Sequence, residues 1–85
     1  MHTTPHPIRI ALQIMDDWLG LPDTTYKATV YRFAYELTPE DVLEAVEIAQ
    51  DKIPDGGMNG FKYFCGVCHG KLKEQRIRQS WNRTA

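Results

Sequence analysis

The residues best able to do chemistry are the two thiols and the imidazole of Cys65-Gly66-Val67-Cys68-His69. The spacing matches C-x-x-C-H, the pattern that attaches a c-type haem through two thiols and uses the following histidine as axial ligand. Cys65, Cys68 and His69 could also form part of a zinc site, although a structural zinc ion takes four ligands. The pair has the spacing of a thioredoxin-type redox site as well, which needs a helix N-terminus beside the thiols.

Packing is the interpretation that the spacing of this segment favours. Positions i, i+3, i+4, i+7 and i+11 share one face of a helix. They are occupied by Phe61, Phe64, Cys65, Cys68 and Leu72. A reduced cysteine commonly behaves as a small buried apolar residue, and Gly66 and Gly70 leave a narrow groove where another helix could approach. We therefore predict that both cysteines belong to a core and that no metal, haem or other cofactor is bound.

A second candidate site begins where the chain becomes basic, with five cations between Lys71 and Arg83 against the single acid Glu74. Lysine and arginine neutralise phosphates, and exposed aromatic rings stack on bases. The candidate nucleic-acid-binding residues are Tyr63, Lys71, Lys73, Arg76, Arg78, Trp81 and Arg83. The alternative is a basic helix end that complements the negative pole of the helix dipole.

The middle of the chain is acidic, with seven carboxylates from Glu36 to Asp55 against the single Lys52. The simplest interpretation is the solvated face of a helix. An acidic face can also bind a protein partner, and a basic end on an acidic body can attract a second copy of the chain. The sequence therefore leaves DNA, another protein and a homo-oligomer as candidate partners.

The elements that position these residues are predicted to be helices, because apolar residues recur at intervals of three and four. Thr38-Pro39-Glu40-Asp41 is a strong helix start, with a capping hydroxyl followed by proline and acids. The segment Tyr26–Leu37 is ambiguous, because Tyr31, Phe33, Tyr35 and Leu37 also alternate as in a strand. A single strand would leave its backbone groups unpaired, so we predict a helix. We predict an all-α fold of about four helices, at roughly 7–19, 24–37, 39–53 and 60–79.

Composition limits the class of protein. The 85 residues suffice for a single domain, predicted to span 1–85 with flexible tails at 1–6 and 80–85. Hydrophobic residues make up 42% and charged residues 25%, as in a globular protein, and the net charge is −1. The start of the chain lacks a secretory pattern, and no apolar run is long enough to cross a membrane. These features predict a cytoplasmic protein without a membrane partner.

Three segments resemble the C-terminal domain of DnaD-like replication proteins of Gram-positive bacteria and their phages. Asp17-Trp18-Leu19-Gly20 is similar to the end of the family's first helix, and residues 38–49 are similar to its third helix. Tyr63 and Val67 match the first two positions of its late Tyr-x-x-x-Ile-x-x-x-Trp helix, whereas Lys71 occupies the tryptophan position. The resemblance implies DNA binding through the late helix and the residues after it, a role in primosome assembly, and self-association.

These observations lead to three functional hypotheses. The first is a non-enzymatic, nucleic-acid-associated accessory module related to phage or mobile-element replication. No paired carboxylates, nucleophile–base set or phosphate-binding glycine loop suggests an enzyme. The second is a protein–protein interaction module, or a phage-borne inhibitor, that binds a host protein through its acidic face. The third is a metal or c-type haem protein that uses Cys65, Cys68 and His69.

Overall fold

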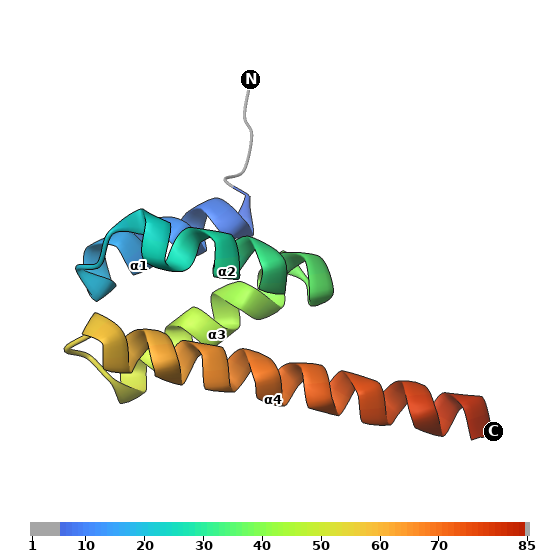
Figure 1. Ribbon diagram of the computed structural model, residues 1–85. Coiled ribbons are helices and arrows are strands. Elements are labelled where there is room, and N and C mark those ends of the chain that lie inside the picture. Colours follow the sequence, from blue (N-terminus) through green and yellow to red (C-terminus); the bar gives the residue numbers. More distant parts are fainter. Residues whose placement is uncertain (1–5, 85) are drawn as a thin grey trace.

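Four helices in an all-α arrangement make up the protein (Figure 1). The computed structural model describes residues 6–84, and side chains only as far as residue 78. The helices are α1 (Pro7–Leu19), α2 (Asp23–Glu36), α3 (Pro39–Lys52) and α4 (Gly57–Thr84). No strand occurs within the described residues. The predicted fold class is therefore confirmed.

Helix α1 has the predicted bounds because both of its ends carry strong local signals. Pro7 occupies the first turn, where its missing N–H would have no intrahelical partner. The ring of His6 adds a cap that the prediction did not include, since its Nδ1 accepts a hydrogen bond from the Ile8 N–H at 3.2 Å. Gly20 ends the helix in the left-handed conformation, with φ of 65°. Between these ends, Ala11, Met15 and Leu19 face the core.

The segment after Pro22 is a helix, not a strand, because its apolar side chains fall on one helical face. Tyr26, Val30 and Phe33 are buried there. The start of α2 is formed by backbone contacts alone. Pro22 holds the cap position, no side chain caps the helix, and the Pro22 carbonyl accepts from the Thr25 N–H at 2.9 Å.

Helix α3 is the centre of the molecule and contacts each of the other three helices. It starts as predicted, because the Thr38 hydroxyl accepts a hydrogen bond from the Asp41 N–H at 3.1 Å. Its inner face is fully buried and consists of Val42, Ala45, Val46 and Ala49. Two alanines on this face let neighbouring helices come close, so α3 can support α1 on one side and α4 on another.

The loop between α3 and α4 is fixed by Trp18 at the end of α1. The indole Nε1–H donates a hydrogen bond to the Ile53 carbonyl at 2.8 Å. Gly56 has φ of 69°, and a Cβ at this position would overlap the backbone carbonyl of Trp18. A Cβ on Gly60 would lie 2.8 Å from the indole ring. The two glycines thus let the start of α4 lie directly against Trp18, which sets the direction in which α4 leaves the loop.

Helix α4 is longer than the predicted 60–79, since it runs from Gly57 to Thr84. The glycine-rich segment before the predicted start already contains the first turn of α4, where the Gly60 N–H donates to the Gly56 carbonyl at 3.0 Å. At the other end, residues 80–84 continue the helix where a flexible tail was expected. No proline interrupts the sequence after Pro54. The 28 residues give a helix of about 42 Å.

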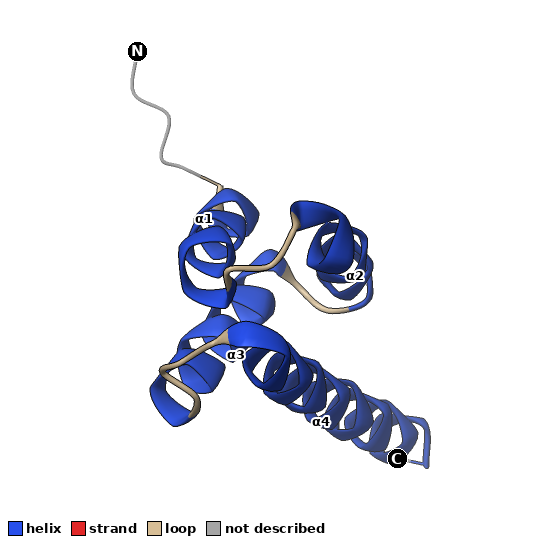
Figure 2. Ribbon diagram, turned by 60° about the vertical axis from the view of Figure 1, so that its left-hand side comes forward, coloured by secondary structure: helices blue, strands red, loops and turns tan. Residues whose placement is uncertain are grey.

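Only one side and one half of α4 pack against the rest of the protein (Figure 2). Phe64 and Cys68 are fully buried, while Phe61, Cys65 and Leu72 pack partly against the core. All side chains from Lys73 to Arg78 are exposed. The helix continues past the other three, and we call residues 73–84 the arm (Figure 1).

Candidate nucleic-acid interface

The exposed side of α4 carries a line of basic side chains that the prediction identified only in part. At about 100° per residue, positions 62, 69, 73 and 76 fall within about 60° of one another. Their side chains are all exposed, and we call them the basic ridge: Lys62, His69, Lys73 and Arg76. Lys62 and His69 were missed because they precede the basic run in the sequence. Their helical spacing of 7, 4 and 3 residues is the signal that would have found them.

The ridge cations are free to meet a polyanion. None of Lys62, Lys73 and Arg76 forms an ion pair with any other side chain that the structure describes. The imidazole of His69 lies edge-on to Phe33 of α2, with ring centroids 5.3 Å apart. This contact holds the ridge beside the surface of α2. The ridge thus combines three uncompensated positive charges with one positioned imidazole.

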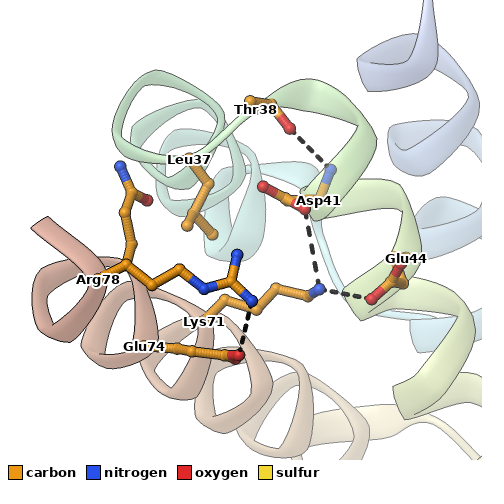
Figure 3. A pocket seen from close by; sticks show the side chains of 8 residues that line it. Leu37, Thr38, Asp41, Glu44, Lys71, Glu74 and Arg78 are labelled. Atoms are coloured by element: carbon orange, nitrogen blue, oxygen red, sulfur yellow. Dashed lines mark hydrogen bonds and ion pairs between the residues drawn. The ribbon is translucent and has the colours of Figure 1, made fainter. Parts of the chain in front are cut away.

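Lys71, in contrast, binds carboxylates of α3 (Figure 3). Its Nζ lies 2.6 Å from Glu44 and 3.9 Å from Asp41, and its side chain is only 19% exposed. These contacts tie the middle of α4 to the start of α3. Lys71 is a predicted nucleic-acid contact, but its charge is already matched within the protein.

Arg78 lies on the same side of α4 as Lys71 and pairs with Glu74 one turn earlier, at 3.2 Å. This pair is exposed and contributes little to stability. Both cations border a polar groove of about 430 Å³ between α3 and α4. The groove is lined by Leu37, Thr38, Asp41, Glu44, Lys71, Glu74, Gln75 and Arg78. Its mixed charges give it no preference for a polyanion, so the ridge is the better candidate surface.

Of the two predicted aromatic contacts, Tyr63 is the one whose side chain the structure describes. Tyr63 is 37% exposed but lies about a quarter turn or more around α4 from the ridge. It borders a mostly apolar groove with Ile53 and Val67, and the ridge residue Lys62 lines the same groove. The side chains of Trp81 and Arg83 lie outside the part of the chain whose side chains the structure describes, so their predicted contacts stay predictions.

The cysteines occupy the packing positions that their spacing predicted. Cys68 is fully buried, and burial raises the pKa of its thiol to about 12. Cys65 is half-buried, and burial raises the pKa of its thiol as well. Since a thiolate is the form that attacks disulfides and binds metals, these raised pKa values favour protonated, unreactive thiols at neutral pH.

His69 does not join the two cysteines in one cluster. It is exposed on the ridge, whereas Cys68 faces the core. Within residues 6–84, no three His, Cys, Asp or Glu side chains are arranged to hold a metal ion. The haem and zinc interpretations therefore gain no support from the geometry of this segment.

The outer face of α3 is acidic, as predicted. Its exposed carboxylates are Glu40, Glu44, Glu47 and Asp51. Of these, Glu44 is shared with Lys71. The acidic face of α3 and the basic ridge of α4 thus lie on two different helices.

Fold and site together define a small all-α protein that exposes a basic ridge on a long final helix. Comparison with known proteins gave no match to a family model, a curated protein or a solved structure. The resemblance to DnaD-like proteins therefore stays a prediction. Within the described residues, no helix is both long and apolar enough to cross a membrane.

Proposed function

We propose that this protein is a non-enzymatic accessory module that binds nucleic acid through the basic ridge of α4. The observation that carries the proposal is the exposed line of Lys62, His69, Lys73 and Arg76, whose three cations no described carboxylate neutralises. Lys62 and Arg76 are 14 positions apart, about 21 Å along the helix axis. A line of this length can follow several successive phosphates of one strand.

The number of unpaired cations on the ridge sets the expected strength of nucleic-acid binding and its dependence on salt. Three phosphate contacts give a slope of about −3 for log K against log salt on duplex DNA, so affinity should fall roughly 40-fold between 50 and 200 mM salt. The net charge of −1 adds no long-range attraction. We therefore expect weak binding without sequence preference, of the kind that an accessory protein uses beside a stronger partner.

Fluorescence anisotropy with a labelled oligonucleotide at low salt tests this proposal. The double variant Lys73→Gln/Arg76→Gln should lower affinity and reduce the salt slope by about two. Lys27→Gln/Lys52→Gln is the matched control, because it removes two exposed charges away from the ridge and should preserve both quantities. Absence of salt-dependent binding in the wild type, or equal losses in both double variants, would sink the proposal.

The resemblance to DnaD-like proteins supports a role in DNA replication of a phage or mobile element, in the cytoplasm. A second candidate function rests on the acidic outer face of α3, which could bind a basic host protein. Asp51→Lys/Glu47→Lys should abolish such binding and preserve DNA binding. Capture of a protein partner that depends on these carboxylates, with no DNA binding at low salt, would favour this second function.

A further inference from the structure

His69 occupies the gap between the cations of the basic ridge. Along the helix axis Lys62 and Lys73 are about 16 Å apart, and His69 lies about 10 Å from the first and about 6 Å from the second. Its side chain is exposed. A neutral imidazole leaves this gap without a charge, whereas a protonated imidazole continues the positive line from Lys62 to Arg76. The ridge therefore has two charge states that differ at one residue.

The surroundings of His69 leave its charge uncompensated. It forms no ion pair with a carboxylate that the structure describes. Within α4, the ridge cations and the half-buried thiol of Cys65 are its neighbours. On α2, the charged residues of the turn that contacts it are Arg32 and Glu36, which pair with each other at 3.2 Å. The α3 carboxylates that face α4 bind Lys71 on the other flank of the helix. A proton on His69 would thus add to the positive surface of the ridge.

The ring of Phe33 holds the imidazole of His69 in place. The two rings are nearly perpendicular, at 84°, and their centroids are 5.3 Å apart. The face of an aromatic ring attracts the positive edge of a neighbouring ring, and it also attracts a cation. The contact can therefore persist when His69 gains a proton. The added charge then appears at a fixed place on the ridge.

We propose that His69 makes nucleic-acid binding by the basic ridge depend on pH, because protonation of the imidazole completes the positive line and strengthens binding as pH falls. Histidine is the side chain that ordinarily changes its charge between about pH 5 and pH 8, whereas lysine and arginine stay charged. The inference rests on the proposed function of the ridge. Since coupling between two ligands is reciprocal, a bound nucleic acid also favours the protonated imidazole, so binding takes up protons.

Fluorescence anisotropy with a labelled oligonucleotide at about pH 5.5 and about pH 8 tests the proposal. For the wild type at 50 mM salt, affinity should be about fivefold higher or more at the lower pH, and the salt slope should steepen by about one, as for one added phosphate contact. His69→Gln keeps a good helix former without a titratable ring, so its affinities at the two pH values should agree within about twofold. His69→Arg carries a fixed charge and should bind at the higher pH about as tightly as the wild type at the lower pH.

His6→Asn is the matched control for titration of another histidine. It removes the second histidine of residues 6–84, and asparagine can still cap α1 in its place. This variant should retain the pH dependence of the wild type.

Calorimetry at about pH 6.5, in two buffers of different ionisation enthalpy, measures the proton uptake directly. Uptake should occur when the wild type binds and should be lost in His69→Gln, an outcome that a general effect of pH on the fold would not give. Binding of equal strength at both pH values, or a pH dependence that His69→Gln retains, overturns this inference and leaves the proposed function standing. Absence of binding at both pH values removes the proposed function and this inference with it.

Discussion

At the scale of single residues, Cys68 shows how burial suppresses the reactivity of a thiol. The thiol faces the core beside Phe64, and its pKa is raised to about 12 by burial, with a smaller contribution from Cys65. In the unfolded chain the same thiol ionises near 9. Below about pH 9 the Cys68 thiol is protonated in both the folded and the unfolded protein, so it makes the free energy of unfolding no more dependent on pH. Above it the unfolded state loses its proton first, so the free energy of unfolding falls as pH rises towards 12.

Urea unfolding between pH 8 and 10 checks this expectation. The wild type should lose stability above pH 9, and Cys68→Ala should show a shallower decline over the same interval despite its lower overall stability. Tyr26 adds to the decline only at higher pH, because burial and the neighbouring Asp16 carboxylate raise the pKa of its phenol above 10.0. A slope that Cys68→Ala leaves unchanged would show that the buried thiol is not its source.

Thiol exposure predicts an order of chemical modification. Cys65 is half-buried and Cys68 fully buried, so iodoacetamide at pH 8 should label Cys65 first and Cys68 only as the protein opens. Mass spectrometry of the native protein gives the order, and labelling in urea, where both thiols should react alike, is the control. Equal native rates would contradict the packing described for α4.

At the scale of elements, glycines in the α3–α4 loop and in α4 have opposite roles. Gly56 combines φ of 69° with a position against the Trp18 carbonyl, whereas a Cβ on Gly66 would meet nothing within 4 Å. Gly56→Ala should therefore destabilise the protein by more than about 1 kcal/mol. Gly66→Ala should stabilise it by about 1 kcal/mol, as for any glycine in a helix interior. Thermal unfolding of both variants should show melting temperatures that shift in opposite directions.

The arm is the second element with a distinct expectation. Since its described side chains, from Lys73 to Arg78, are all exposed, the core does not need them. A chain that ends at Lys73 should keep a cooperative thermal transition within a few degrees of the full chain, because surface changes usually alter stability by less than about 0.5 kcal/mol. Its helical circular dichroism signal should fall. A core that melts without cooperativity would show that the arm supports the fold.

At the scale of the whole molecule, local signals predicted the fold well. Periodic apolar residues placed four helices, and Pro7, Gly20 and Thr38 fixed three of their ends. The start of α4 was predicted at residue 60 instead of Gly57, because the glycines just before residue 60 are typical of a loop. Gly56 lies against the backbone carbonyl of Trp18 and Gly60 against its indole. Trp18 is 38 or more positions earlier in the chain, and no local pattern records such contacts.

The candidate site was predictable as a basic segment but not as a surface. Lys71 and Lys73 are the same residue type and lie two positions apart. Lys71 nevertheless binds Glu44 of α3, whereas Lys73 is exposed on the ridge. This division follows from the side of α4 against which α3 packs, and no local pattern in the sequence records that contact. Lys62 and His69 join the ridge through helical spacing alone, once α4 is known to begin before them.

The hydrogen bond between Trp18 and Ile53 also bears on the direction of α4, because it holds the loop from which this long helix starts. The loop to which the indole is hydrogen-bonded lies at one end of α4, and the end of the arm lies about 42 Å away along the helix. A tilt of only about 10° at the loop would move that end by about 7 Å. The indole N–H of Trp18, 2.8 Å from the Ile53 carbonyl oxygen, thus fixes the loop end of α4, while buried Phe64 and Cys68 and the Lys71–Glu44 ion pair hold the rest of its first half.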